Sequence, residues 1–125
     1  MPGEVVLPIL RAGRIVPADW RGDALPKEPN KLKPAVAVEQ VGYLGTNYPK
    51  VTLVPLTEDP RLAPRTLSLH LQPTAENGCS KPCWAASSLV AATSKQRVRV
   101  TKSAVTSKQL EIIRQQIASA IGVRD

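Results

Sequence analysis

Short runs of apolar residues, each ended by glycine, proline or polar residues, follow one another through most of the chain. Runs of about four to eight residues rich in branched side chains are typical of β-strands, because such side chains pack well on a pleated surface. This pattern predicts strands at residues 3–10 (GEVVLPIL), 34–41 (PAVAVEQV) and 50–57 (KVTLVPLT). The second of these runs is apolar enough to be buried on both faces.

Three later segments, residues 65–71 (RTLSLHL), 83–91 (CWAASSLVA) and 96–101 (QRVRVT), carry shorter strand patterns. Apolar and polar residues alternate in the first and the last of them, so that each predicted strand has an inner and an outer face. The predicted inner residues are Leu67, Leu69, Leu71, Val98 and Val100. The predicted outer residues are Thr66, Ser68, His70, Arg97 and Arg99.

The end of the chain, residues 106–122 (TSKQLEIIRQQIASAIG), has the period of a helix instead. Thr106 and Gln109 have the spacing of a capping box, in which each side chain bonds to the backbone N–H of the other residue. Gly122 stands where a C-terminal cap is expected. A single apolar stripe at helical spacing is formed by Leu110, Ile113, Ile117 and Ile121.

Five or six short strands followed by one amphipathic helix predict a mainly β fold with a C-terminal helix. A small, strongly bent sheet or barrel, closed by the helix across one face, would bury this pattern. With 125 residues, the chain is expected to form a single domain over residues 1–125. Residues 11–32 hold three arginines and three prolines and are predicted to be one long loop, in which Trp20 either pins the loop or offers a stacking surface.

The charge balance is basic, with 17 Lys and Arg against 10 Asp and Glu, a formal net charge of +7. Such a balance favours a polyanionic partner, usually nucleic acid, although many basic domains simply have a solvated basic surface. The N-terminal residues do not have the pattern of a signal peptide, and no run approaches the roughly 18 apolar residues of a membrane span. We therefore expect a cytoplasmic protein that has no membrane partner.

The chemistry open to this chain is limited, because it has one histidine and two cysteines and lacks a glycine-rich phosphate loop. Cys79 and Cys83 stand four residues apart without a second pair, so two free thiols are expected, with no metal and no cofactor. An enzyme built from arginine, lysine, carboxylates and hydroxyls is suited to RNA cleavage. The RNA supplies its own 2′-hydroxyl nucleophile, and the protein needs only to stabilise charge and move two protons.

Motifs in this order resemble those of the MazF/PemK/Kid toxins of type II toxin–antitoxin systems. GEVVLPIL is similar to the first strand of that family, which begins with glycine and an acidic residue. KLKPAVAV (31–38) is similar to the second strand, and TLVPLTED (52–59) to the third, in which Val-Pro precedes a functional threonine. The closing helix is similar as well, so that the resemblance spans the whole chain.

The resemblance implies an SH3-like β-barrel of the MazF/CcdB-like plasmid toxin fold, a homodimer, and a metal-independent endoribonuclease that cleaves single-stranded RNA at specific sequences (an mRNA interferase). In the family, an arginine before the second-strand proline and the threonine ending the third strand line the site. Thr57 matches the threonine, whereas Lys33 stands at the arginine position. Lysine is a flexible point charge and not a planar fork of donors. Lys33 and Thr57 are thus the candidate catalytic residues, and whether Lys33 supports cleavage stays open.

The resemblance also equates residues 11–32 with a family loop that shapes the RNA groove and is reorganised by an acidic antitoxin protein. Arg11, Arg14 and Arg21 then become candidate phosphate contacts. Arg61 and Arg65 follow Thr57 closely enough for at least one to face the same groove. The alternative for each of the five is a solvated surface arginine.

Two other functions fit part of the pattern. A non-catalytic MazF-like module would keep the basic groove and bind nucleic acid or a partner protein without cleavage, and the lysine at position 33 favours it. A CcdB-like gyrase inhibitor acts through its extreme C-terminus, including a tryptophan, whereas this chain ends in GVRD.

Overall fold

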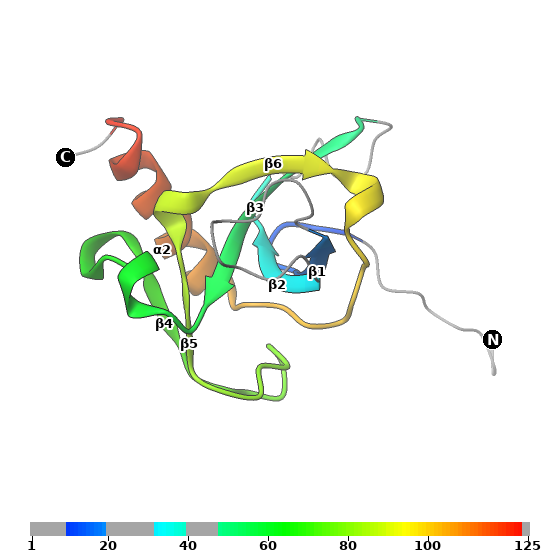
Figure 1. Cartoon of the computed structure of the whole chain (residues 1–125), viewed down its shortest axis with the longest axis horizontal. Coiled ribbons are helices and arrows are strands. Elements are labelled where there is room, and N and C mark those ends of the chain that lie inside the picture. The colour runs from blue at the N-terminus through cyan, green and yellow to red at the C-terminus, as the bar shows by residue number, and fades with distance from the viewer. Residues whose placement is uncertain (1–9, 20–31, 40–47, 124–125) are drawn as a thin grey trace.

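The computed structural model describes residues 10–19, 32–39 and 48–123, and these residues contain six strands, four short 3₁₀ helices and one α-helix. The strands are β1 (Ile15–Asp19), β2 (Leu32–Ala37), β3 (Lys50–Thr57), β4 (Leu69–Leu71), β5 (Cys83–Ala85) and β6 (Ala91–Ser94), and the α-helix is α2 (Ser107–Ala120). The 3₁₀ helices are Pro60–Leu62, Arg65–Leu67, Ser87–Leu89 and Lys95–Arg97. Mainly β structure with a C-terminal helix is therefore confirmed (Figure 1).

Strand β3 is the centre of the sheet, and its bounds are those that the sequence predicts. One edge of β3 pairs with β2, while the other edge pairs first with β6 and then, near Thr57, with β5. All pairings are antiparallel, and the path runs β1-β2-β3-β5-β4 with β6 branching from β3. No pairing between the described strands joins β1 to β4, so closure into a barrel stays a prediction.

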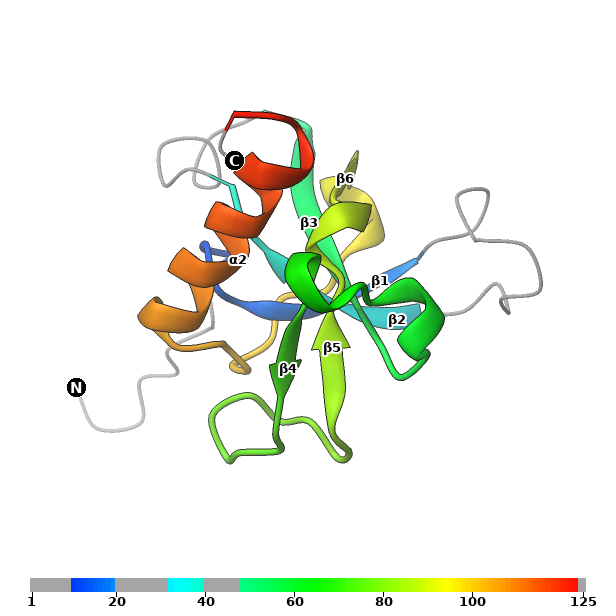
Figure 2. The ribbon, with the colours of Figure 1, turned by 90° about the vertical axis from the view of Figure 1, so that its left-hand side faces the viewer.

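The core has two parts, because alternate residues of β1, β2 and β3 point to opposite faces. The first cluster is covered by α2 through Ile113 (Figure 2), and its strand members include Ile15, Val36, Val54 and Leu56. The second cluster consists of Val16, Ala18, Ala35, Ala37, Val51 and Leu53. Ala35, Val36 and Ala37 have no exposed surface, which confirms that this part of β2 is buried on both faces.

Helix α2 begins and ends as its sequence indicates. The capping box between Thr106 and Gln109 is present, and Gly122 adopts a positive φ of 84° after the last turn. Ile113 is fully buried, but Ile121 is 67% exposed because the helix has ended before it, which corrects the predicted stripe. Arg114 fastens the helix to the end of β2 by donating hydrogen bonds to the carbonyls of Val38 and Glu39.

The prediction of one long loop over residues 11–32 is wrong for its first part, since β1 occupies Ile15–Asp19. The arginine and proline in this segment argue against a strand when the sequence is read alone. In the structure Pro17 lies opposite Pro34, and since neither residue has a backbone N–H, no donor is left unpaired between them. The strand predicted at 3–10 lies outside the described residues except for Leu10, which is not in a strand. Trp20, Arg21 and the rest of the predicted loop up to residue 31 also lie outside them.

Of the three later predicted strands, two are shorter than predicted and the third does not form. Residues 65–67 form a 3₁₀ helix, and Ser68 is buried and not exposed, because its hydroxyl donates a 2.7 Å hydrogen bond to the carbonyl of Pro64. Residues 83–91 divide into β5, a 3₁₀ helix and the start of β6. Residues 96–101 form no strand. They contact β1 through an isolated bridge between Val98 and Ala18 and through a hydrogen bond from the Thr101 hydroxyl to the carbonyl of Ile15. The alternation there holds, with both arginines exposed and both valines half-buried.

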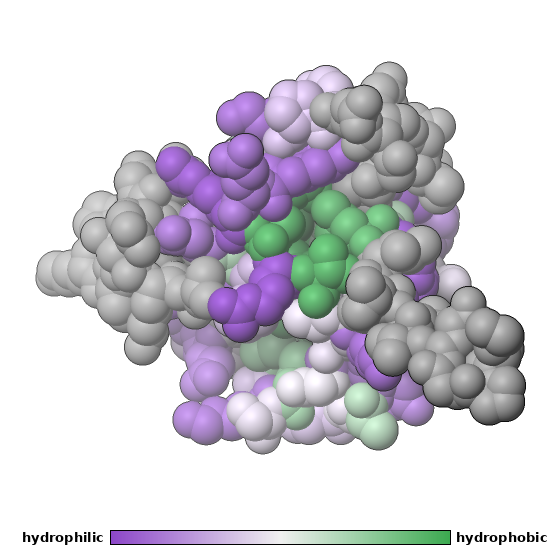
Figure 3. All heavy atoms as spheres, turned by 90° about the vertical axis from the view of Figure 1, so that its right-hand side faces the viewer, coloured by the Kyte–Doolittle hydropathy of each residue, from purple (hydrophilic) through white to green (hydrophobic). Residues whose placement is uncertain are grey.

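The segment after β6 runs along the outer edge of β1. Ile15 donates to the carbonyl of Ser103 at 2.8 Å, and Arg99 donates to the carbonyl of Pro17 at 3.1 Å. On this side of the molecule apolar side chains gather in the middle of the surface and hydrophilic ones border them (Figure 3). Leu10, Ala12 and Val98 are the partly buried members of the second cluster. Among the described residues, no helix has the length and apolar character needed to cross a membrane.

Candidate active site

A depression of about 630 Å³ opens where the ends of β1, β2 and β3 meet the loop 72–82 and the segment 101–103. Its apolar part is built by Pro17 and Pro34, which face each other across β1 and β2, together with Ile15 and Leu56. Its polar part combines lysines, carboxylates, hydroxyls and two thiols. These polar lining residues are Lys33, Thr57, Glu58, Asp59, Asn77, Cys79, Ser80, Lys81, Cys83, Thr101 and Ser103.

The two candidate catalytic residues, Lys33 and Thr57, both line this depression and are both half-buried. The recorded pairing of β2 with β3 begins at Ala35 and Pro55. Beyond this pair, Leu56 and Thr57 at the end of β3 pair with β5. On the other edge of β3, Thr57 pairs with Trp84 of β5, whose ring lies 5.1 Å from that of His70.

The turn after β3 fixes the hydroxyl of Thr57. The backbone N–H of Asp59 donates to Oγ1 of Thr57 at 3.0 Å. A threonine hydroxyl has two acceptor sites and one proton to donate. Since the bond from Asp59 uses only an acceptor site, the hydroxyl can still donate its proton to a group that enters the depression.

Asp59 is held by Arg61 in a bidentate ion pair with N–O distances of 2.9 to 3.2 Å. The side-chain hydrogen bonds from Arg61 are the main reason that the pKa of Asp59 lies below its usual value. The carboxylate also accepts the backbone N–H of Arg61 at 2.9 Å, which caps the 3₁₀ helix Pro60–Leu62. Asp59 is therefore a weak base, whereas the neighbouring Glu58 is exposed at the rim.

The loop 72–82 forms one wall of the depression and is shaped by Asn77, which is buried. Oδ1 of Asn77 accepts the backbone N–H groups of Thr74 and Cys79, and its Nδ2 donates to the carbonyl of Gln72. Gly78 has a positive φ of 65° and passes so close to Ser103 that a Cβ would lie 2.5 Å from its hydroxyl oxygen. The loop is thereby anchored to the segment that borders β1.

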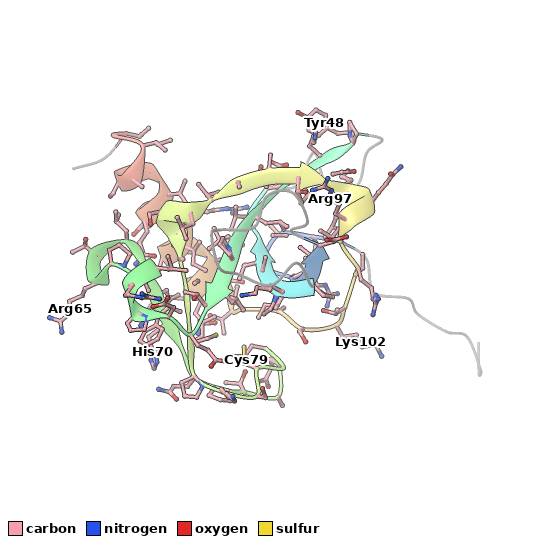
Figure 4. All side chains as sticks on the ribbon, in the orientation of Figure 1. Tyr48, Arg65, His70, Cys79, Arg97 and Lys102 are labelled. Atoms are coloured by element: carbon pink, nitrogen blue, oxygen red, sulfur yellow. The ribbon has the colours of Figure 1, made fainter. Side chains whose placement is uncertain are left out.

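Of the five candidate arginines, the four that lie in the described part of the chain are not among the lining residues. Arg14 points its guanidinium at the carbonyl of Lys102, to which Nη1 donates at 3.0 Å, and Arg11 is exposed just before β1. Arg61 borders the depression through Asp59. Arg65 lies on the outer side of the molecule, away from Cys79 (Figure 4). With Arg21 outside the described residues, RNA contact by these arginines stays a prediction.

The sequence reasoning overlooked most of the wall. Lys81, Cys79 and Asn77 lie in a segment that the sequence indicates only as a loop, and the glycine after Asn77 is the one local signal of a tight turn there. Thr101 ends the segment 96–101, which the sequence predicts to be a strand, and Ser103 comes from a region without a strand or helix pattern. Within the described ranges no group of three or more His, Cys, Asp or Glu side chains could hold a metal ion.

A family model described as PemK-like, MazF-like toxin of type II toxin–antitoxin systems matches residues 11–121. The match begins after GEVVLPIL and covers β1 to the end of α2. No curated protein sequence matches the chain.

The fold is similar to solved structures of toxins. MazF from Deinococcus radiodurans is 16% identical, with a TM-score of 0.68 over 91% of this chain and 97% of that one. An endoribonuclease in complex with its cognate antitoxin, from Mycobacterial species, is 15% identical, with a TM-score of 0.61 over 93% and 96%. Mycobacterium tuberculosis toxin MazF-mt6 is 14% identical, with a TM-score of 0.66 over 86% and 95%. At these identities the likeness is one of fold.

Proposed function

This chain belongs to the PemK-like, MazF-like family of type II toxins, and from this premise we propose that it is an endoribonuclease that cleaves single-stranded RNA. The observation that carries the proposal is the meeting of Lys33 and Thr57 at one depression. Lys33 comes from β2 and Thr57 from the end of β3, and both line the same depression. RNA as substrate also agrees with the net charge of +7.

The proposed reaction is attack of the RNA 2′-hydroxyl on the adjacent phosphate, with departure of the 5′-oxygen of the next nucleotide. Negative charge develops on the phosphate oxygens in the transition state, and groups positioned to meet that charge lower the barrier. Lys33 offers a positive charge, and Thr57 offers its hydroxyl proton, because the bond from Asp59 leaves that proton available. The resemblance to the family implies that no metal ion takes part.

Proton transfer needs a base for the 2′-hydroxyl and an acid for the leaving oxygen. Of the two carboxylates at the depression, Asp59 is engaged by Arg61, and its lowered pKa makes it a poor base. Glu58, exposed at the rim, is the better candidate for this role. Lys33, with its ammonium group, is the candidate acid.

The proposal includes two protein partners. The structural neighbours include MazE–MazF from Deinococcus radiodurans and an endoribonuclease in complex with its cognate antitoxin. An acidic antitoxin would be attracted to this basic chain. A homodimer is implied by the family resemblance. Action in the cytoplasm follows from RNA as the substrate.

A non-catalytic RNA-binding module is the second candidate, and one observation favours it. Lys33 stands where the resemblance implies an arginine. The planar guanidinium of arginine can donate to two phosphate oxygens at once, whereas the ammonium group of lysine is a single point charge. Such a module would use the same depression and the same charge for binding alone.

The experiment that separates the two candidates is incubation of the purified chain with a long single-stranded RNA in EDTA, with primer extension to map the ends. Lys33→Ala and Thr57→Ala are run beside the wild type. Lys95→Ala, on the 3₁₀ helix after β6, is the matched control for loss of a lysine away from the depression. Discrete cuts that vanish in the first two variants and persist in the control support the ribonuclease. Intact RNA at concentrations that shift it in a gel supports the binding module.

A further inference from the structure

Both cysteines of the chain lie in the wall of the depression, although they were expected to be unremarkable free thiols. Their sulfur atoms are 4.0 Å apart. Cys79 is partly exposed on the loop 72–82 (Figure 4), while Cys83 is only 7% exposed and belongs to the first core cluster. Cys79 is therefore the more accessible of the two residues, and Cys83 is the more buried.

The surrounding structure holds the two sulfur atoms in this arrangement. Asn77 binds the backbone N–H of Cys79 at 2.9 Å, and the loop is tied to the edge of β1 by a 2.9 Å hydrogen bond from Ala104 to the carbonyl of Glu76. Cys83 is held in the sheet by its pairing with Leu71 of β4. The approach of the thiols is thus a property of an anchored loop and a strand.

We propose that Cys79 and Cys83 are an oxidation-sensitive dithiol that takes a low-molecular-weight disulfide as its oxidant, and that the resulting protein disulfide slows RNA cleavage in the adjoining site. The second half of this proposal rests on the proposed ribonuclease function. The first half concerns the thiols alone and is measured without RNA.

The exchange proceeds in two balanced steps. The thiolate of Cys79 attacks one sulfur of the small disulfide, which releases one small thiol and leaves a mixed disulfide on Cys79. The sulfur of Cys83 then gives up its proton, attacks the sulfur of Cys79 and releases the second small thiol. The two protein thiols are oxidised and the small disulfide is reduced to two thiols. Burial raises the pKa of Cys83 to about 12, which agrees with Cys79 as the first attacking group.

Formation of the Cys79–Cys83 disulfide requires movement in the wall of the depression. A disulfide has a sulfur–sulfur distance of about 2 Å, so the two atoms have to approach by about 2 Å from their present separation. Cys83 is followed by Trp84, which pairs directly with Thr57, and Ala85 pairs with Leu56. A displacement of Cys83 on closing the bond would be passed through this pairing to the end of β3, where Thr57 meets the RNA phosphate in the proposed reaction.

The test uses the full chain, reduced and then treated with glutathione disulfide. Intact mass and alkylation are expected to show loss of two hydrogen atoms and protection of both cysteines. Cys79→Ser, at the partly exposed position, is expected to keep its mass, because the remaining thiol is buried. Cys83→Ser, or Cys83→Ala if the serine variant is poorly folded, is expected to stop at the mixed disulfide and to gain one glutathione. Thiols that stay reduced in the wild type would overturn the proposal.

RNA cleavage is measured on the same samples, each variant against its own reduced form. The oxidised wild type is expected to cleave about tenfold more slowly, with recovery after dithiothreitol, while treatment leaves the rate of Cys79→Ser unchanged. A disulfide without any change of rate would also overturn the proposal. If the reduced protein leaves RNA intact, it is the ribonuclease function that has failed. In that case the Kd for RNA is measured by gel shift for the oxidised and the reduced protein. An equal Kd for the two forms counts against an effect of the disulfide on the site.

Discussion

The backbone N–H of Asp59 donates a 3.0 Å hydrogen bond to Oγ1 of Thr57, so the turn that ends β3 also orients the hydroxyl of the candidate catalytic threonine. The same turn is stabilised by the ion pair between Asp59 and Arg61. Because the hydroxyl accepts from the turn, its proton is directed away from Asp59. The hydroxyl of Thr57 therefore has a fixed orientation at the end of β3.

Replacement of Thr57 by valine keeps the shape of the side chain and removes the hydroxyl. We expect the rate of RNA cleavage to fall by about 10²-fold, since loss of one donor to transition-state charge has an effect of this order. Thr57→Ser keeps the hydroxyl and should retain most of the rate. Single-turnover cleavage at saturating protein measures both variants. Valine at the wild-type rate would remove Thr57 from the mechanism.

Replacement of Lys33 by arginine restores the residue that the family resemblance implies. A guanidinium can hold two phosphate oxygens at once, so we expect Lys33→Arg to cleave at least as fast as the wild type. Lys33→Gln has no charge and is expected to lose about 10²-fold in rate. The same single-turnover assay measures both variants. Equal cleavage rates for the wild type and Lys33→Gln would show that the positive charge of Lys33 does not contribute to catalysis.

Gly78→Ala is expected to lower the free energy of unfolding by about 1–3 kcal/mol, because alanine is strained at a φ of 65° and its Cβ would meet the Ser103 hydroxyl. Urea unfolding measures the loss. Gly122→Ala is the matched control, since Gly122 has a φ of 84° but open space at its Cβ, and its loss should be smaller. Adding Ser103→Ala to Gly78→Ala should recover part of the difference. Equal losses at both glycines would contradict the close approach.

Stability is expected to fall at alkaline pH through Cys83. Burial raises the pKa of its thiol from 9.0 to about 12, so the folded protein retains a proton that the unfolded chain loses. The stabilisation is complete below pH 9 and is lost as pH rises towards 12. Urea unfolding under reducing conditions at several values above pH 9 should show a steeper decline for the wild type than for Cys83→Ala, and parallel declines would argue against a neutral buried thiol.

The sequence by itself determined the elements whose local pattern agrees with their environment. Strand β3 has the same first and last residues as predicted. Its sequence, KVTLVPLT, places apolar side chains on both faces of the strand, and proline and acidic residues bound it. The capping box of Thr106 and Gln109 and the turn at Gly122 are local signals too, and the start and end of α2 follow from them. Family resemblance pointed from the sequence to Lys33 and Thr57.

Only the tertiary structure decided the rest. Residues 15–19 form a strand because β2 on one side and the segment 98–105 on the other supply hydrogen-bond partners for their backbone groups. This backbone pairing outweighs the low strand preference of Pro17. Ser68 is buried because Pro64 supplies a hydrogen-bond acceptor that no alternation rule contains. The depression is assembled from β1, β2, β3, the loop 72–82 and residues 101–103. Local patterns carry no record of which distant segments pack together, so the presence of Cys79 and Cys83 in the same depression as Thr57 could be seen only in the folded chain.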